Sequence, residues 1–229
     1  KMWQKFVKES QGPILDVGCG TGRVLNSLAE SGYQLLGIDI SSEAICIAQN
    51  KIRNSKVSFL QSDMCSFEIS QKDFGLALLI HNTLLHCLSL EDQLGCLKSI
   101  HRHLNNSGRL LIDISIPPNL RPDTQNQIQF GGEFEDGEGY LVHWQLMYTA
   151  DLCEQILNCI QWLDRIEENG TVRSAIIRFQ QRFIYRREME LLLKFSGFSV
   201  EAIYCDYEFG RLTRDSEKMI FVAKKLNIV

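Results

Sequence analysis

Residues 14–25 read ILDVGCGTGRVL, and this stretch decides the fold. The apolar run from Ile14 to Val17 is strand-like, three glycines follow it, and Val24 and Leu25 begin a helical pattern. A glycine-rich turn between a strand and a helix lets the backbone approach a ligand closely, because glycine has no Cβ. The stretch therefore predicts an α/β fold with a ligand site at its first turn.

The first half of the chain repeats this alternation of apolar runs and helical patterns. Strands are expected at residues 14–17, 34–38, 57–60, 74–80 and 109–114, and helices at 22–30, from Ser41 or Ser42 onward, and at 90–104. FGLALLI (74–80) shows no polar alternation, which indicates a parallel strand buried on both faces. We therefore predict a doubly wound, Rossmann-like sheet, completed by a helix at 186–195 and strands at 200–204 and 219–223.

Residues 117–185 have a different pattern. Long strand-like segments such as YLVHWQLMY and ILNCIQWLDRI alternate with the turn signals EDGEG and EENG, the latter ending in Asn169-Gly170. These segments predict three or four antiparallel strands inserted into the α/β fold. The expected division is a ligand-binding core at 1–116, an insertion at 117–185 serving as substrate lid or dimer element, and the rest of the core at 186–229.

The spacing of the glycines excludes two common ligands. A phosphate-binding loop of the Walker type needs a Lys-Ser or Lys-Thr pair after its last glycine, and here Arg23 follows Gly22. A dinucleotide turn needs G-x-G-x-x-G. Gly18 and Gly20 fit that pattern, but Arg23 occupies the third position, where a long side chain hinders close packing of helix and strand.

DVGCGTG instead closely resembles motif I of the class I S-adenosylmethionine-dependent methyltransferases, and the likeness covers nearly the whole chain. GIDIS and LQSDM carry acids at the family's spacing, DFGLALLIHNTLLHCL is similar to motif IV, and LNNSGRLLIDI resembles the segment ending in the fifth strand. The resemblance implies a seven-stranded sheet whose last strand is antiparallel, and S-adenosylmethionine as the cofactor, with S-adenosylhomocysteine as its product.

The same resemblance implies roles for individual residues. Asp39 accepts hydrogen bonds from both ribose hydroxyls, Asp63 lies near the adenine amino group, and Met64 packs against the ring. Asp16 accepts from the backbone or from the cofactor's ammonium group. The expected cofactor-binding set is Asp16, Gly18, Cys19, Gly20, Asp39, Ile40, Asp63, Met64 and His81.

Catalytic and acceptor-binding residues are harder to predict, since in-line methyl transfer mainly requires alignment of the nucleophile. His86 is a candidate general base or acceptor-lining residue, and Tyr185 and His143 are further candidate bases. The expected acceptor-contacting residues are Asn82, His86, Trp144, Arg178 and Tyr185, with Tyr148 and Trp162 as additional lining candidates.

Composition and missing motifs restrict the acceptor. The chain has 229 residues, a net charge of −4 and a pI near 5.8, which argues against nucleic acid as the main partner. The [DN]PP[YF] motif of exocyclic-amine nucleic-acid methyltransferases does not follow the fourth strand, where IHNT stands, and the Pro-Cys nucleophile of carbon-5 enzymes is missing there too. A small-molecule acceptor, methylated at N, O or C, is therefore expected.

Eight dispersed cysteines without a CxxC pair, and five dispersed histidines, predict a reduced protein with no bound metal. Together with the lack of a long apolar segment, they predict a cytoplasmic protein without membrane contact. A homodimer through the inserted strands is a further expectation. The alternatives that stay open are a protein or RNA methyltransferase, a non-catalytic cofactor-binding scaffold and a nicotinamide oxidoreductase.

Overall fold

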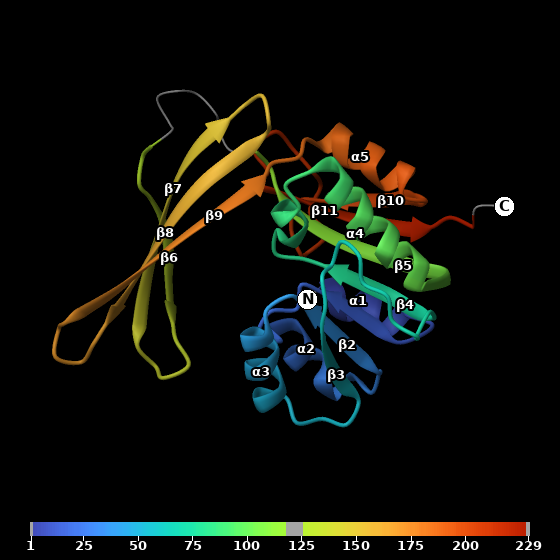
Figure 1. Ribbon diagram of the computed structural model, residues 1–229, viewed down its shortest axis with the longest axis horizontal. Coiled ribbons are helices and arrows are strands. Elements are labelled where there is room, and N and C mark those ends of the chain that lie inside the picture. Colours follow the sequence, from blue (N-terminus) through green and yellow to red (C-terminus); the bar gives the residue numbers. More distant parts are fainter. Residues whose placement is uncertain (1, 118–125, 228–229) are drawn as a thin grey trace. The chain divides into compact units, whose positions relative to one another are not determined.

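The computed structural model describes residues 2–117 and 126–227 and divides into two compact units, residues 1–116 with 184–229 and residues 117–183 (Figure 1). The first unit is built on a seven-stranded sheet with the order β10-β11-β5-β4-β1-β2-β3. Its strands are β1 (Ile14–Val17), β2 (Leu35–Asp39), β3 (Val57–Gln61), β4 (Phe74–Leu79), β5 (Leu104–Ser115), β10 (Phe198–Tyr204) and β11 (Lys218–Lys225).

The topology confirms the predicted sheet. Strands β1 to β5 pair in parallel, and β11 enters antiparallel between β5 and β10. Because β1 pairs with both β2 and β4, the strand order reverses beside β1, and the glycine turn follows that strand directly. Ligands of open α/β sheets bind at such a switch point.

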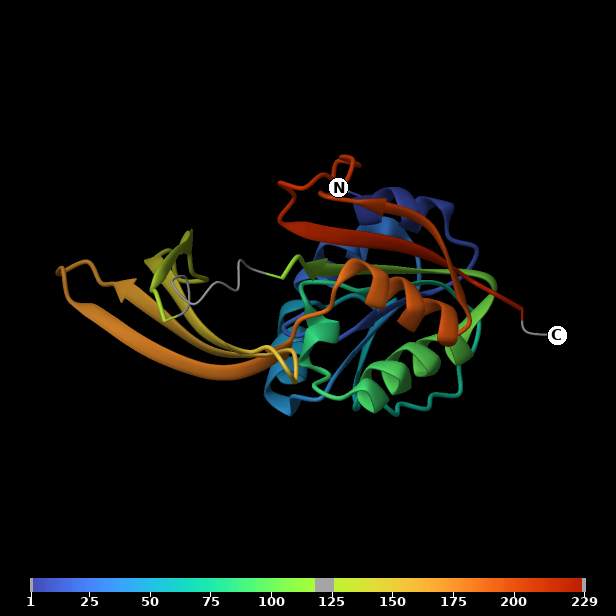
Figure 2. The ribbon, with the colours of Figure 1, turned by 90° about the horizontal axis from the view of Figure 1, so that it is seen from above.

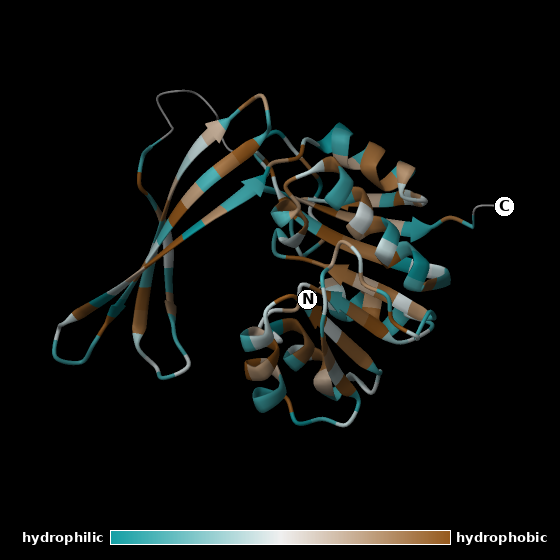
Figure 3. Ribbon diagram, viewed as in Figure 1, coloured by the Kyte–Doolittle hydropathy of each residue, from teal (hydrophilic) through white to brown (hydrophobic). Residues whose placement is uncertain are grey.

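Helices cover both faces of this sheet (Figures 1 and 2). Two hydrophobic clusters fill the faces, one with α4 and α5 and the other with α1, α2 and α3. The central strands β1 and β4 are almost wholly apolar and buried (Figure 3), which explains their continuous hydrophobic sequences. The helices are α1 (Met2–Glu9), α2 (Arg23–Leu28), α3 (Ser42–Lys51), α4 (Leu90–His103) and α5 (Arg186–Phe195), with 3-10 turns η1 (Ala29–Ser31) and η2 (Thr83–His86).

The helix α1 was not predicted, and the start of β5 differs from the expectation. Its buried residues Trp3 and Phe6 contact Tyr207 and Phe209, which lie about 200 residues further along the chain. Strand β5 begins at Leu104 rather than 109, with a register shift between its pairings to Phe74 and Leu76. Of the two serines expected to cap α3, Ser41 does so, accepting from the amide of Ala44 at 3.1 Å.

None of the helices within residues 2–117 and 126–227 combines the length and the apolar character needed to cross a membrane.

The second unit is a four-stranded antiparallel sheet with the order β6-β7-β8-β9, the upper end of the predicted range. Its strands are β6 (Gln129–Glu135), β7 (Leu141–Asp151), β8 (Ile156–Ile166) and β9 (Val172–Arg182). Gly170 has a φ of 81° in the predicted Asn-Gly turn between β8 and β9. The sheet exposes large apolar side chains on both faces: Phe130 and Ile176 share one, and Phe134 and Ile177 share the other.

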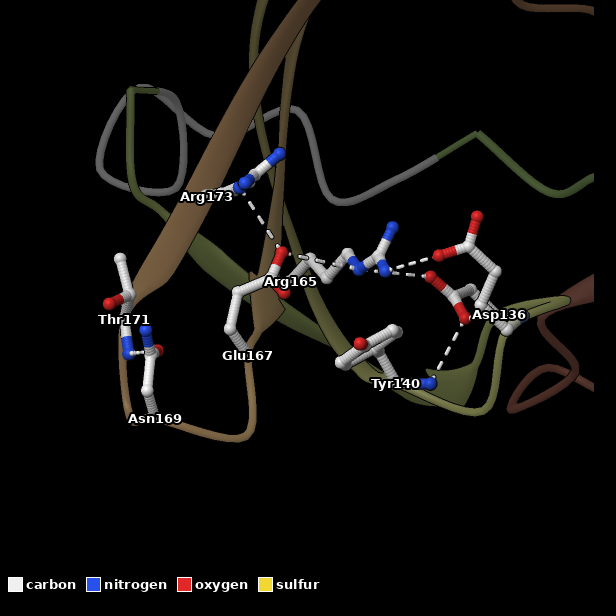
Figure 4. Close-up of polar contacts among 8 residues, drawn as sticks. Asp136, Tyr140, Arg165, Glu167, Asn169, Thr171 and Arg173 are labelled. Carbon is white, nitrogen blue, oxygen red and sulfur yellow. Dashed lines mark hydrogen bonds and ion pairs between the residues drawn. The ribbon is translucent and has the colours of Figure 1, made fainter.

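Two hairpin tips of the second unit are tied together through Arg165 (Figure 4). Its guanidinium lies 2.6 Å from Glu138, 3.3 Å from Asp136 and 3.6 Å from Glu167, and stacks 3.8 Å from the centre of the Tyr140 ring. Asp136 and Glu138 belong to the β6–β7 turn and Glu167 to the β8–β9 turn. Arginine suits this place because its planar, permanently charged group can form ion pairs with carboxylates and stack on an aromatic ring at the same time.

We expect Arg165→Met to loosen both tips while leaving the strands intact. Amide exchange in the turns 136–140 and 167–171 should accelerate by roughly two- to five-fold, since exposed ion pairs are individually weak. Hydrogen exchange measured by mass spectrometry checks this. Arg173→Met removes an arginine that is 78% exposed and that pairs, among the described residues, with Glu167 alone; it is the matched control and should change only the second turn. Equal amide exchange rates in Arg165→Met and wild type would show that Arg165 does not stabilise the two turns.

Candidate functional site

The glycine turn after β1 is held in place by backbone and carboxylate hydrogen bonds. Asp39, at the end of β2, accepts the amide of Gly20 at 2.8 Å with one carboxylate oxygen and the amide of Ser41 at 2.9 Å with the other. Gly18 adopts a φ of 70°, and a Cβ at this position would lie 2.3 Å from Cγ2 of Thr83. Asp39 thus fixes the turn beside its own strand and keeps further lone pairs for a ligand.

The third glycine of the turn explains why an arginine is tolerated after it. A Cβ on Gly22 would lie 2.9 Å from Ile52 and 3.1 Å from Ala48, so Gly22 provides the close packing against α3. Arg23 is exposed, and its guanidinium donates to Nε2 of His81 at 2.6 Å. The close approach expected of a dinucleotide turn is therefore present, one residue earlier in the chain.

A cavity of about 300 Å³ opens beside this turn. Its wall combines residues from four chain segments, and each segment lies at or just after the end of a strand. The predicted residues on its wall are Gly18, Asp39, Ile40, Asp63, Met64 and His86, and the wall also includes Ile38, Ser62 and Thr83. The last three were not predicted, although each is a sequence neighbour of a predicted residue or of η2.

The wall of the cavity combines the charged side chain of Asp63 with apolar side chains. One oxygen of Asp63 accepts the amide of Cys65 at 2.8 Å, which orients the carboxylate at the start of its loop. Ile40 is 68% exposed, far more than an isoleucine would be in a completed core. A carboxylate beside exposed apolar side chains suits a planar ring that carries a polar group.

Asp16 lies behind the turn and is 2% exposed. Burial, then the charge of Asp39, raises its pKa to about 7, and the charge of Arg23 opposes this shift. Within the residues that the structure describes, Oδ2 of Asp16 has no hydrogen-bond partner. A buried carboxylate oxygen without a donor is costly, so a ligand bearing a cation would be favoured here.

We expect Asp16→Asn to stabilise the ligand-free protein above pH 7. A carboxyl group whose pKa is higher in the folded state contributes stability at low pH and loses it as the pH rises from about 4 to 7. The variant, which does not titrate, should exceed the wild type by about 2 to 3 kcal/mol at pH 8 and match it near pH 4. Denaturant unfolding at both pH values checks this; parallel pH curves for both proteins would contradict the assignment.

Cys19, within the same turn, is buried, and its pKa is raised by burial and by the charges of Asp16 and Asp39. It therefore remains a neutral thiol.

His81 and Asn82 follow β4 with left-handed φ angles of 62° and 63°. Asn82 stabilises this strained pair. Its amide donates to Asp113 at 3.1 Å, while its side chain donates to the Ser115 hydroxyl at 2.9 Å and accepts from the Ser115 amide at 2.7 Å. The side chain of Asn82, predicted to contact the acceptor, is thus engaged with β5. Consecutive strained residues are characteristic of functional sites.

His86, on η2, lines the cavity, and burial lowers its pKa. Its imidazole is therefore neutral near pH 7 and able to accept a proton. Tyr185 lies at the N-terminus of α5 with 53% of its surface exposed, and its amide donates to Glu188 at 3.4 Å. The structure does not bring Tyr185 to the wall of the cavity.

The predicted residues of the second unit do not form one group. Trp144 pairs with Leu163 and packs its ring against Gly131, whereas Arg178 pairs with Ile160. The register places Trp144 and Tyr148 on one face of the sheet and Arg178 and Trp162 on the other. Arg178 lines a separate cavity of about 330 Å³ on its own face. A pocket on one face of this sheet can therefore include either Trp144 and Tyr148 or Trp162 and Arg178, but not both pairs.

Known proteins resemble this chain over its whole length. A family profile described as "Methyltransferase domain" matches residues 14–108. A Bacillus subtilis protein named as a methyltransferase, YqeM, is 29% identical, with 97% of this chain and 89% of that protein covered. An S-adenosylmethionine-dependent methyltransferase from Clostridium acetobutylicum has the same fold, with a TM-score of 0.82, 17% identity and coverage of 99% and 92%. The sugar N-methyltransferase KedS8 from Streptoalloteichus gives a TM-score of 0.72, 20% identity and coverage of 98% and 85%.

Proposed function

We propose that this chain, which belongs to the class I S-adenosylmethionine-dependent methyltransferases, transfers the methyl group to a nitrogen atom of a small-molecule acceptor. The observation that carries the proposal is the cavity beside β1, closed at one end by a turn that the Asp39 carboxylate holds.

The residues of this cavity fit the cofactor. Asp39 retains acceptor sites for the two ribose hydroxyls after binding the amides of Gly20 and Ser41. Ile40 and Met64 offer apolar surfaces to the adenine ring, and Asp63 accepts from its amino group. Asp16 has a buried oxygen without a protein donor, which suits the cofactor's ammonium group. Together these residues supply acceptors for the ribose hydroxyls, the adenine amino group and the ammonium group of the cofactor.

When bound, the cofactor would supply a methyl carbon on a cationic sulfur, so that an acceptor lone pair could bond to that carbon in line while the carbon–sulfur bond breaks and the neutral sulfide leaves. The chain's residues must therefore align the acceptor and accept its proton. His86 suits the second task because it lies on the cavity wall and burial keeps its imidazole neutral. We assign it as the general base; Tyr185 remains a second proposal, since it lies away from the cavity wall.

Nitrogen is the favoured acceptor atom. KedS8, which shares the fold, is named as a sugar N-methyltransferase, and like this chain it is an α/β protein of similar length. A neutral amine has its own lone pair, so it needs only positioning and a weak base such as a neutral imidazole. Within the second unit, Arg178 and Trp162 line the more polar face and are our proposed acceptor contacts; Trp144 belongs to the opposite face.

Exposed apolar side chains on both faces of the second unit support a homodimer. Exposed phenylalanine and isoleucine side chains on both sides of a sheet indicate that another protein surface packs against it. Sedimentation velocity tests this: a concentration-independent monomer would refute the dimer.

Transfer of a deuterated methyl group tests the function. Mass spectrometry should find a trideuteromethyl group on amino sugars or other small amines, and on no hydroxyl or carboxyl compound in the same panel. Labelling of oxygen acceptors alone would contradict the choice of nitrogen. Labelling of RNA, with binding that weakens steeply with salt, would favour the nucleic-acid alternative. Binding of S-adenosylhomocysteine without transfer to any acceptor would favour a scaffold.

A further inference from the structure

The short turn η2 carries two residues of the cavity wall, Thr83 at its start and His86 at its end. Between them, Leu84 and Leu85 are buried in the core. The turn thus has an apolar middle that packs inward and two ends that reach the cavity. Where the imidazole of His86 lies on the wall therefore depends on how the ends of η2 are held.

Asn82, the residue before η2, is bound to β5 through both its side chain and its backbone. The side chain donates to the Ser115 hydroxyl at 2.9 Å and accepts from the Ser115 amide at 2.7 Å. The Asn82 amide donates to Oδ1 of Asp113 at 3.1 Å, and its carbonyl accepts the amide of Leu85 at 2.9 Å. Because the Ser115 amide can only donate, the oxygen of the Asn82 carboxamide must face it, which fixes the orientation of the group.

The backbone before η2 needs this support. His81 and Asn82 have left-handed φ angles of 62° and 63° in succession. Asparagine adopts this conformation more readily than most residues, but two such residues in a row persist only where the surrounding structure holds them. The strand that holds them is β5, which lies between β4 and β11 in the sheet and is therefore well supported.

The other end of η2 is held by α4. Gln93 in the first turn of that helix is fully buried, and its Nε2 donates at 3.2 Å to the carbonyl of Cys87, the residue after His86. One buried carboxamide from the helix layer and one carboxamide bound to the sheet thus enclose a turn of four residues. The Asn82 contact supplies the larger share, since it provides three hydrogen bonds to β5 against one from Gln93.

We propose that Asn82 is a positioning residue for methyl transfer, which holds η2 against β5 so that His86 faces the acceptor. The inference rests on the proposed function, in which the imidazole of His86 accepts the proton of the acceptor. A general base must lie within hydrogen-bond reach of that proton, and a displacement of about 1 Å can cost roughly 100-fold in rate. This role also explains why Asn82, expected to contact the acceptor, directs its side chain to Ser115 instead.

Asn82→Gly tests the proposal, because glycine keeps the left-handed backbone and removes only the carboxamide. Nuclear magnetic resonance would follow the titration of the histidine side chains in the ligand-free protein. Burial lowers the pKa of His86 in the wild type, and this pKa should rise by about 0.5 or more once the loosened turn admits water. With an amine that the deuterated-methyl assay identifies, kcat should fall by roughly 10- to 100-fold while KM for the cofactor stays within about three-fold. Ser115→Ala, which removes one of the two side-chain partners, should give a smaller change of the same kind.

Asn126→Gly is the matched control, because Asn126 also has a left-handed φ, of 61°, and belongs to the second unit. It should leave both the titration of His86 and kcat unchanged. An unaltered pKa of His86 in Asn82→Gly would overturn the proposal, and so would an unaltered kcat. Equal pKa changes at His86 and at His101, whose pKa is also lowered by burial, would overturn it too, because they indicate general loosening. If the wild type transfers no methyl group to any acceptor, the proposed function fails, whereas the titration of His86 still decides whether Asn82 positions it.

Discussion

Asp39→Ala is expected to weaken binding of S-adenosylhomocysteine by about 2 to 3 kcal/mol, or roughly 30- to 150-fold. The carboxylate has two tasks: it accepts from the cofactor's ribose, and it holds the amides of Gly20 and Ser41 at 2.8 and 2.9 Å. Removing it loses charge-assisted hydrogen bonds to the ligand and releases the turn against which the ligand lies. Isothermal titration calorimetry at fixed pH and salt measures the effect.

Two companion variants separate the tasks of Asp39. Asp39→Asn retains one oxygen that can accept an amide, so it should keep the turn in place and lose less affinity than Asp39→Ala. Glu43→Ala removes an exposed carboxylate four residues later and the same unit of charge, and its affinity should equal that of the wild type. If Asp39→Ala binds as tightly as Glu43→Ala, the ribose assignment is wrong.

The fold was predictable because each buried parallel strand is a short apolar run ended by a polar or glycine residue. FGLALLI marks β4 by itself, and the acids Asp39 and Asp63 could be placed at one edge because each follows a strand. The helix α1 was not predicted, because its amphipathic pattern is short. Its apolar residues Trp3 and Phe6 are buried by Tyr207 and Phe209, which are distant in the sequence.

That several candidate residues would lie together beside the glycine turn was predictable from local sequence, whereas the grouping of the acceptor candidates was not. Five of the predicted cofactor-binding residues share one cavity with His86, because the turn and the strand ends carry them there. The contact between Arg23 and His81 joins residues 58 positions apart, and no local pattern indicates it. Trp144 and Arg178 lie on opposite faces because the strand register decides which residues share a face.

Gly18→Ala is expected to destabilise the protein by about 3 kcal/mol and to reduce cofactor affinity by at least about ten-fold. The new Cβ would lie 2.3 Å from Cγ2 of Thr83, and the φ of 70° is unfavourable for alanine. Thr83 cannot turn away at no cost, because its hydroxyl donates to the carbonyl of Ile80 at 2.7 Å. The backbone must therefore shift, and it forms part of the cavity wall. Chemical denaturation and calorimetry measure the two losses.

Gly20→Ala distinguishes the steric clash with Thr83 from the cost of an alanine at positive φ. Its φ is 54°, but a Cβ there meets no atom within 4 Å, so the variant should lose only the strain energy, about 1 to 2 kcal/mol. Combining Gly18→Ala with Thr83→Ser removes Cγ2 and keeps the hydroxyl, and should restore part of the stability. A Gly18→Ala protein no less stable than Gly20→Ala would show that Thr83 does not confine the turn. In that event the wall of the cavity at Gly18 and Thr83, on which the assignment of the cofactor site depends, would lose its structural basis.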